Sequence, residues 1–434
     1  MTKNSLPKGV FDIYPLSPKD ELEGDEAWKD SALWQYLEKE IRELAHLFGL
    51  LEVRTPVFER TELFTRSVGV ETDIVSKEMY TFDDKGGRSM SLRPEGTAPA
   101  IRALVDHRLQ PDGPVHKLYY IGPMFRYERQ QLGRYRQHHQ FGAEVVGDGS
   151  PLRDAELIDL LWTLLRKLGL SQLSLQINSI GTNEARSRYK AALREYLRAH
   201  LGALTPDSLR RFETNPLRIL DSKEEADQAI LVGAPSLLDF LEPDCLRHFA
   251  DLQAALKELG IPFEVNPRLV RGLDYYNRTV FEITTSELGA QNSLGGGGRY
   301  DGLVKSLGGP DLPALGFGAG LERIIQTLLR QKIALPPRPH VTALLLPLGE
   351  SARQPAFRLL KRLREQGVAA EIDLGERKLK VALRLADQMG VDYVLLLGDE
   401  ELTTETCTVK TMKGHASERI ALDQVIHYLK DSHV

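Results

Sequence analysis

Cysteine is scarce in this chain of 434 residues, which contains only Cys245 and Cys407. Two cysteines cannot build a disulfide framework, so the disulfide-rich secreted class is excluded. No C-x-x-C pair or His/Cys cluster with zinc-ligand spacing occurs, so the sequence predicts no zinc site and leaves any metal ligand unknown. A cytoplasmic protein with free thiols is expected.

Long apolar runs are also missing. No stretch approaches the length of a membrane span, and the N-terminal MTKNSLPKGVFDIYP has no signal-peptide core. An excess of basic residues is absent as well, since the net charge is −5. We therefore expect no membrane association, and any contact with nucleic acid must come from local basic patches.

The composition that remains is typical of a globular protein. Apolar residues make up 42% of the chain and charged residues 27%. The length exceeds one ordinary domain, so two or three domains are expected.

The most informative stretch is 122–147, GPMFRYERQQLGRYRQHHQFGAEVVG. Strand-like runs at 115–121 and 140–146 flank a turn at Gly133, which predicts an antiparallel hairpin with a long basic loop. Arg126 and Glu144 are expected near the strand ends, facing one pocket. Guanidinium groups suit phosphate because their planar fork matches two oxygens. For a single arginine, however, a solvated hairpin is the better explanation.

Two further stretches place polar groups at predicted strand ends. In RSMSLRPEGTAPAIR (88–102), Glu95 and Thr97 stand where a short strand runs into a helix, and they serve either a ligand amine or the helix N-terminus. In 262–285, two strand-like runs flank R-G-L-D-Y-Y-N-R-T, with Arg271, Tyr275 and Tyr276 at the rim of the sheet. Packing alone is the better explanation of an isolated Tyr-Tyr pair.

Glycine-rich segments follow. GGGGRYDGL (295–303) allows close approach of a ligand, and the alternative is a flexible turn. It is not a Walker loop, because no G-K-[ST] follows. ALGFGAGLERII (314–325) predicts a strand of small residues and a helix that begins near Leu321, with Arg323 projecting from the helix start. The spacing does not fit a dinucleotide-binding fingerprint.

Periodicity outlines the rest of the chain. A helix is expected at 27–48, capped by Gly49, and then a strand, LLEVRTPVFE, whose Pro56 favours an edge or interface position. A helix at 155–168 and a strand at 173–178 precede a mostly helical region, 182–260, which resembles a solvated lid or bundle. The proline-rich ALPPRPH, 334–340, is a linker. Beyond it, strands at 343–348, 370–374, 393–397 and 406–412 alternate with helices at 352–366, 377–389 and 421–429, which predicts an α/β domain with a mixed sheet.

These motifs together resemble class II aminoacyl-tRNA synthetases, and most closely the histidyl-tRNA synthetase family. F-R-x-E-R, G-R-Y-R-Q and Q-x-G-x-E are similar to motif 2, the helix and proline-containing strand to motif 1, and G-L-E-R to motif 3. L-R-P-E-G-T and R-G-L-D-Y-Y-N-R-T-V-F-E resemble segments that contact histidine. The resemblance implies an α+β fold with an antiparallel sheet and flanking helices. It implies a catalytic core at 1–181 and 261–333, a helical insertion at 182–260, the linker at 334–340 and an anticodon-binding α/β domain at 341–434.

The resemblance also implies a function and its residues. The chain is expected to be a homodimeric ligase that activates L-histidine with ATP and Mg²⁺ and transfers it to the histidine tRNA. Arg126 and Arg271 would be catalytic. The implied histidine-binding residues are Glu95, Gly96, Thr97, Arg126, Gln140, Glu144, Arg271, Tyr275, Tyr276 and Tyr300. The implied ATP-binding residues are Arg126, Glu128, Arg271 and Arg323. The implied acceptor-stem contacts are Arg129, Gln131, Arg134 and Arg136.

Two other functions are compatible with parts of this pattern. A catalytically silent paralogue could bind histidine and regulate a partner, as the synthetase-like subunit of ATP phosphoribosyltransferase does. Such paralogues typically lack the C-terminal domain and have a degraded R-G-L-D-Y-Y region. In this chain the C-terminal domain is present and the R-G-L-D-Y-Y segment is intact. A ligase acting on something other than tRNA would also adenylate an amino acid, but it would not need the basic hairpin loop.

Overall fold

The computed structural model describes residues 5–16, 26–69, 72–107, 113–128, 133–287, 292–375, 377–414 and 416–431. The chain divides into two compact units. One comprises Met1–Asp12 and Leu33–Ala334, and the other comprises Ile13–Ala32 and Leu335–Val434. Within the described part of the chain, no helix is both long enough and apolar enough to cross a membrane.

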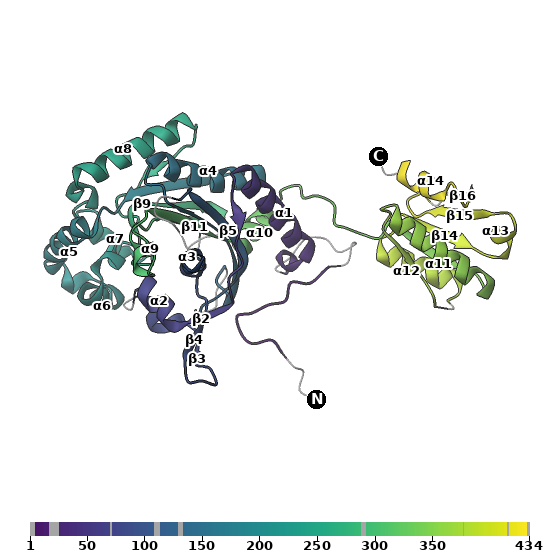
Figure 1. Ribbon diagram of the computed structural model, residues 1–434, viewed down its shortest axis with the longest axis horizontal. Helices are drawn as coiled ribbons and strands as arrows, with labels where there is room; N and C mark the ends of the chain where they lie inside the picture. Colours follow the sequence, from purple (N-terminus) through teal and green to yellow (C-terminus); the bar gives the residue numbers. More distant parts are fainter. Residues whose placement is uncertain are drawn as a thin grey trace. The chain divides into compact units, whose positions relative to one another are not determined.

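An eight-stranded sheet forms the centre of the first unit (Figure 1). Its strand order is β1-β5-β6-β11-β10-β9-β7-β8. The five inner pairings, from β5 to β7, are antiparallel, whereas β1 with β5 and β7 with β8 are parallel. The strands are β1 Leu51–Glu52, β5 His116–Phe125, β6 Gln137–Val146, β7 Leu173–Ser179, β8 Glu264–Val265, β9 Asn277–Thr285, β10 Ser293–Arg299 and β11 Ala314–Gly320. The predicted antiparallel sheet is confirmed.

The predicted hairpin is β5 and β6, paired in register from His116 with Val146 to Phe125 with Gln137. The strand and helix predicted at 314–325 are also confirmed, as β11 and α10, Leu321–Arg330. The alternative interpretation of the glycine run, a flexible turn, was wrong, because residues 295–298 lie inside β10, between β9 and β11. Glycine gives no side-chain alternation, so a glycine strand carries no pattern of its own.

The two faces of the sheet differ sharply because side chains alternate along a strand. One face carries Phe141, Phe281 and Phe317, which stack edge to face and are buried. Helix α4, Pro151–Lys167, packs on β9, β10 and β11. The opposite face carries glycines at neighbouring register positions of β6, β11 and β10, namely Gly142, Gly316, Gly318, Gly320, Gly296 and Gly298. Without side chains, these positions make room for the side chains of Tyr120 and Glu144, over Gly142 and Gly316, and for open space over Gly318 and Gly320.

The N-terminal part of the chain departs from the prediction. A short helix, η1 Ala27–Lys29, precedes α1, Ser31–Leu47, where one helix was expected. Gly49 adopts a positive φ of 71° just after α1, as a C-terminal cap requires. The expected single strand is broken around Pro56, which has no N–H to donate. Its first part is β1 at the edge of the large sheet, and its second is β2, Phe58–Arg60.

Strand β2 belongs to a separate three-stranded sheet, β2-β4-β3, with β3 Thr81–Asp83 and β4 Ser89–Leu92. Short helices border this sheet and the large one: α2 Thr61–Ser67, η2 Ile74–Glu78, α3 Thr97–Asp106 and α9 Leu303–Ser306. The helix expected at 155–168 begins earlier, because Ser150 caps it by accepting a hydrogen bond from Leu152 N and Pro151 starts its first turn.

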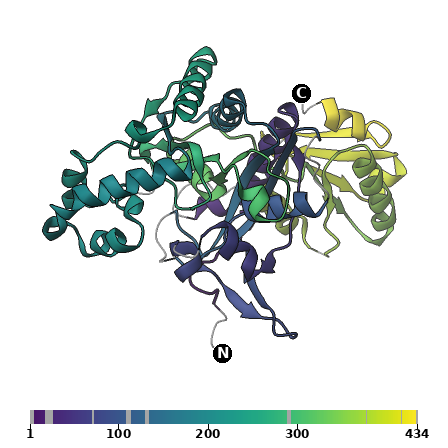
Figure 2. The ribbon, with the colours of Figure 1, turned by 60° about the vertical axis from the view of Figure 1, so that its left-hand side comes forward.

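The region predicted to be helical, 182–260, contains helices only (Figure 2). They are α5 Asn183–Arg198, η3 Leu201–Ala203, α6 Pro206–Thr214, η4 Pro216–Ile219, α7 Glu225–Leu231, η5 Leu237–Phe240 and α8 Pro243–Glu258. The sequence expectation was a solvated lid or bundle, and the helices do form a bundle, which packs against the core. Buried insertion residues such as Leu193 and Ile219 form one apolar cluster with Tyr276 and Tyr300 of the core.

The second unit contains the predicted mixed sheet, in the order β13-β12-β14-β15-β16. Its elements are β12 Ala343–Pro347, α11 Glu350–Glu365, β13 Ala370–Ile372, α12 Leu379–Met389, β14 Tyr393–Leu397, α13 Asp399–Thr403, β15 Thr406–Thr411, β16 Ser417–Ala421 and α14 Val425–Asp431. The sequence prediction missed strand β16, which occupies Ser417–Ala421. The helix expected at 421–429 therefore begins later than predicted, at Val425. The largely exposed residues of β16 give a weak strand signal.

Candidate active site

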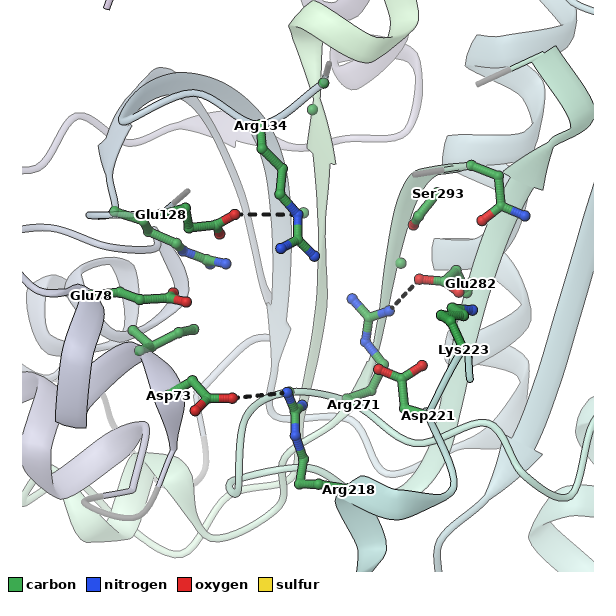
Figure 3. Close-up of a pocket in the computed structure, with 18 of the residues that line it drawn as sticks. Asp73, Glu78, Glu128, Arg134, Arg218, Asp221, Lys223, Arg271, Glu282 and Ser293 are labelled. Atoms are coloured by element: carbon green, nitrogen blue, oxygen red, sulfur yellow. Dashed lines mark hydrogen bonds and ion pairs between the residues drawn. The ribbon is translucent and has the colours of Figure 1, made fainter. Parts of the chain in front are cut away.

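A cavity of about 920 Å³ lies over the glycine-bearing face of the large sheet (Figure 3). Gly296, Gly318 and Gly320 line it. Six residues predicted for the site also line it: Arg126, Glu128, Arg134, Gln140, Arg271 and Arg323. The cavity is therefore bordered by cations from the hairpin, from the segment before β9 and from the start of α10.

Arg126 and Arg271 reach the cavity from different segments and are held differently. Arg126 directly follows β5, and its Nε donates a 2.8 Å hydrogen bond to the carbonyl of Pro94. Arg271 donates from Nη1 to Oε1 of Glu282 on β9, at 3.0 Å. Burial alone would lower the pKa of Arg271, but the combined interactions with Glu282, Tyr276 and Tyr275 outweigh it and raise the pKa. Nε of Arg271 is buried without a hydrogen-bond partner among the described residues, so a donor remains for a ligand.

Glu144 is the centre of a buried polar cluster and is itself fully buried. The Thr97 hydroxyl donates to its Oε1 at 2.8 Å, Tyr120 donates to the same oxygen at 3.2 Å, and Tyr300 donates to Oε2. Glu144 pairs with Leu118 on the hairpin, far from its loop end. Arg126 lines the cavity, whereas Glu144 lies among buried groups, so the expectation that both face one pocket stays a prediction.

Glu95 is held at the N-terminus of α3. Its carboxylate accepts from the backbone N–H groups of Thr97 and Ala98, at 2.7 and 2.8 Å. Burial raises the pKa of Glu95, while these two hydrogen bonds oppose the shift. The helix-capping interpretation of Glu95 is therefore confirmed, whereas contact of Glu95 and Thr97 with a ligand amine stays a prediction. Gly96, between them, lies against Tyr120, whose ring leaves no room for a Cβ.

Tyrosines surround this cluster. The ring centroids of Tyr275 and Tyr276 are 4.7 Å apart, and those of Tyr275 and Tyr300 are 5.5 Å apart. The Tyr275 hydroxyl is buried and has no hydrogen-bond partner in the described part of the chain. Burial raises the pKa of all three hydroxyls, so they stay protonated and can donate.

Burial raises the pKa of Glu144 to about 8, against the hydrogen bonds from Tyr300 and Thr97, which lower it. Nearby Glu95 adds to the rise. The carboxyl group thus titrates near neutral pH, which is a property of functional sites. It can hold a proton in the empty site and exchange it with a basic ligand.

Tyr300 is positioned by its neighbour, Arg299, whose side chain is fully buried. Arg299 pairs with Asp154 of α4 at 2.6 Å and donates to the carbonyl of Ser150 at 2.9 Å. Oδ2 of Asp154 is also 2.8 Å from Nε2 of His248 on α8. This network joins α4, α8 and the end of β10, and its ion pair is fully desolvated, so removal of one partner would be costly.

Arg323 and His138 form another side of the cavity. Arg323 donates to the carbonyls of Gly133 and Ser293, at 3.0 and 2.9 Å, which ties α10 to the hairpin loop and to β10. Burial first, and then the charges of Arg126 and Arg323, hold the pKa of His138 well below its usual value. His138 is therefore a neutral imidazole at neutral pH.

The loop residues are only partly described. Arg129 and Gln131 lie outside the described residues. Arg134 pairs with Glu128 at 3.2 Å and lines the cavity, as Figure 3 shows. The guanidinium of Arg136 stacks over the ring of Tyr127, at 3.9 Å from its centroid.

Sequence reasoning missed several groups at the site. Glu282 was part of the R-G-L-D-Y-Y-N-R-T-V-F-E motif, but its pairing with Arg271 was not foreseen. Tyr120 is one of two adjacent tyrosines in β5, with no pattern to distinguish it. Arg218 and Lys223 of the insertion also line the cavity, and their mixed charged surroundings gave no signal. The described residues contain no cluster of three or more His, Cys, Asp or Glu side chains suited to a metal ion.

The antiparallel sheet with its arginine-bordered cavity, followed by a unit with a mixed sheet, defines the class: it is the architecture of class II aminoacyl-tRNA synthetases. Comparison with known proteins makes the family specific. The family model described as histidyl-tRNA synthetase matches residues 25–324, and the model described as anticodon binding domain matches residues 342–432. The chain belongs to the histidyl-tRNA synthetase family.

Individual proteins agree with this assignment. The chain is 54% identical over 429 residues to a histidine–tRNA ligase of Protochlamydia amoebophila, covering 99% of this chain and 100% of that protein. The crystal structure of apo histidyl-tRNA synthetase from S. aureus superposes with a TM-score of 0.79 at 35% identity, covering 98% and 100% of the two chains. An ATP phosphoribosyltransferase regulatory subunit/histidyl-tRNA synthetase from Bacillus halodurans has a TM-score of 0.64 at 22% identity, covering 92% and 99%, and shows the shared fold alone.

Proposed function

We propose that this protein charges the histidine tRNA in two steps. The carboxylate of L-histidine first attacks the α-phosphorus of ATP, giving histidyl-adenylate and pyrophosphate. The terminal ribose hydroxyl of the tRNA then attacks the activated carbonyl. The observation that carries the proposal is the buried cluster of Thr97, Tyr300 and Glu144 behind a cavity that Arg126 and Arg271 line.

Adenylation depends on positioning and on neutralising charge, because phosphoryl transfer leaves little covalent chemistry to the protein. Arg126 and Arg271 bracket the α-phosphate and stabilise the charge that develops on its oxygens. Both are fixed in advance, Arg126 by the Pro94 carbonyl and Arg271 by Glu282, so little reorganisation is needed at the moment of reaction.

Histidine is recognised at both of its ends. Glu95, Thr97 and Gln140 hold the amino group, next to Gly96. Glu144 and Tyr276 face the imidazole, with Tyr275 and Tyr300 beside them. A ligand that cannot pair with Glu144 would leave a buried polar group unsatisfied, and sites of this kind discriminate by roughly 10⁴-fold or more.

ATP is held by Arg126, Glu128, Arg271 and Arg323. Magnesium enters with the nucleotide. The described residues contain no cluster of three acidic or imidazole ligands, which fits an ion held mainly by phosphate oxygens and water. When bound, the ion supplies positive charge to the phosphates. Arg126 and Arg271 supply positive charge to the phosphates independently of the ion.

The tRNA and the second subunit extend the proposal beyond the cavity. Arg129, Gln131, Arg134 and Arg136 contact the acceptor stem, and the C-terminal unit reads the anticodon. Val57, just before β2, and Phe58, on β2, leave exposed apolar surface, which supports a homodimer formed through this region. Both cysteines are buried free thiols, which suits a reducing cytoplasm, where we place the protein.

The test is ATP–pyrophosphate exchange with each amino acid in turn, followed by charging of the histidine tRNA. Exchange should depend on histidine, and charging should occur only with the histidine tRNA. Exchange without charging of any tRNA would favour a ligase for another acceptor. Histidine binding without exchange would favour a regulatory paralogue, against which the intact R-G-L-D-Y-Y segment and the C-terminal unit argue.

A further inference from the structure

The helical insertion forms one wall of the cavity. Residues between Thr205 and Glu224 line it together with Arg271 and Arg126. Three cations of this segment, Arg211, Arg218 and Lys223, are among them. The insertion therefore brings three cations to the space in which the nucleotide would bind, together with the carboxylates of Asp207, Asp221 and Glu224.

This segment is held in a fixed shape by Asp227, which is fully buried. Its carboxylate accepts from the hydroxyls of Thr205, Ser208 and Ser222, at 2.8, 2.6 and 2.6 Å, and from the backbone N–H of Thr205, at 3.0 Å. The hydrogen bonds outweigh burial and lower the pKa of Asp227. One anchored carboxylate thus fixes both ends of the segment.

Arg218 lies on η4 between these ends. Its neighbour Ile219 is fully buried in the cluster that contains Tyr276, which directs the side chain of Arg218 outward. Nη1 of Arg211 donates to the carbonyl of Arg218 at 3.3 Å. The Arg218 guanidinium lies over Gly272, where a Cβ would be 2.9 Å from Nη1.

The guanidinium of Arg218 is held loosely. Among the described residues it pairs with the carboxylate of Asp73, with Nη2 to Oδ2 at 3.6 Å, which is longer than the 2.7–2.9 Å of a charge-assisted hydrogen bond. Asp73 is shared with Lys77, at 3.3 Å. Figure 3 shows Arg218 and Arg271 with their carboxylate partners on opposite sides, Asp73 for the first and Glu282 for the second. An anion in the cavity can therefore meet both guanidinium groups.

We propose that Arg218 binds the β- and γ-phosphates of ATP and the pyrophosphate that leaves, an inference that rests on the proposed adenylation. Arg271 is assigned to the α-phosphate, and Arg218 lies against the next residue, Gly272. The β- and γ-phosphates would therefore extend from Arg271 towards Arg218. As the carboxylate oxygen of histidine bonds to the α-phosphorus, the bond to the bridging oxygen breaks. Its electron pair leaves with pyrophosphate, whose charge Arg218 neutralises.

The experiment measures ATP–pyrophosphate exchange of the full chain, with inorganic pyrophosphate and ATP titrated separately. Arg218→Ala should raise the KM for pyrophosphate by roughly 10- to 100-fold, because a charge-assisted contact is lost, and should leave the KM for histidine within about twofold. Arg218→Lys should recover part of the loss. Arg198→Ala, which removes an exposed ion pair with Glu195 on α5, is the matched control and should behave as the wild type.

The variant Asp73→Asn distinguishes phosphate binding by Arg218 from a purely structural role, in which the Arg218–Asp73 pair holds the insertion in place. If Arg218 binds phosphate, removing its weak partner leaves the KM for pyrophosphate unchanged or lowers it. If the pair only holds the insertion in place, Asp73→Asn reproduces the defect of Arg218→Ala, and the proposal is overturned. An equal rise in the KM for histidine, or a rise in the KM for tRNA with normal exchange, overturns it too. Wild-type protein without histidine-dependent exchange would instead refute the proposed function itself.

Discussion

The hydroxyl of Thr97 donates a 2.8 Å hydrogen bond to Oε1 of Glu144, although 47 residues separate the two in the chain. Thr97 stands at the start of α3, and Glu144 lies on β6. The bond joins the segment assigned to the amino group of histidine to the carboxyl group assigned to the imidazole. In the proposed site, both ends of the amino acid would therefore meet one connected set of hydrogen bonds.

Replacing Arg271 tests the chemical step. Arg271→Ala should reduce the rate of histidine-dependent ATP–pyrophosphate exchange by roughly 10²–10³-fold, the effect of removing one preorganised donor at a developing charge. The fold should survive, because Arg271 borders a cavity and its partner Glu282 becomes accessible to water. Thermal melting provides the control. Exchange at near wild-type rate would refute the role given to Arg271.

Replacing Glu144 tests the recognition of histidine. Glu144→Gln should weaken histidine binding at least about tenfold while ATP binding changes by less than about twofold, because the lost contact is charge-assisted and lies apart from the nucleotide residues. Separate calorimetric titrations of histidine and of ATP measure the two effects. An equal loss for both ligands would mean that Glu144 acts on the cavity as a whole.

The raised pKa of Glu144 predicts how stability depends on pH. Between the unperturbed value of 4.5 and about 8, the folded protein holds a proton on Glu144 that the unfolded chain has lost. Rising pH therefore destabilises the fold through this group, by at most about 1.4 kcal/mol per pH unit, and the effect ends above the folded pKa. Glu144→Gln removes this contribution. Its free energy of unfolding relative to the wild type should rise from pH 5 to pH 8 and then level off, and parallel pH profiles would contradict the buried, protonated carboxyl group.

The glycine face of the sheet offers a matched pair of substitutions on β11. A Cβ at Gly316 would lie 1.7 Å from Oε2 of Glu144, whereas at Gly318 the nearest side-chain atom, of Gln140, is 3.7 Å away. Gly316→Ala should displace Glu144 and raise the KM for histidine by at least about tenfold, with a loss of stability of roughly 1–3 kcal/mol from overpacking. Gly318→Ala should remain stable and active. Pyrophosphate-exchange kinetics and denaturant unfolding of both variants provide the measurement. If the two variants had the same KM for histidine and the same stability, the backbone of β11 would be able to move away from Glu144.

Several elements could be predicted because their own residues specify them. The strand-like runs on either side of the turn at Gly133 predicted the β5–β6 hairpin, and the small residues at 314–320 predicted β11. Strand β10 could not be predicted in this way. Its glycines are required by neighbours that are remote in sequence: a Cβ at Gly297 would lie 2.0 Å from the carbonyl oxygen of Gly316, and one at Gly298 would lie 2.2 Å from that of Thr279.

The sequence by itself determined the local elements and the chemical types at the site: two arginines, two glutamates and the tyrosines beside them, each within a short motif. Their spacing in the chain determines which residues share a strand face or a helix end, because side chains alternate along a strand and recur every three or four residues along a helix. Only the tertiary structure decided that Glu144 is enclosed by Thr97, Tyr120 and Tyr300, and that Arg218 of the insertion shares a cavity with Arg271. Such contacts depend on burial and on the pairing of distant strands, which no local pattern encodes.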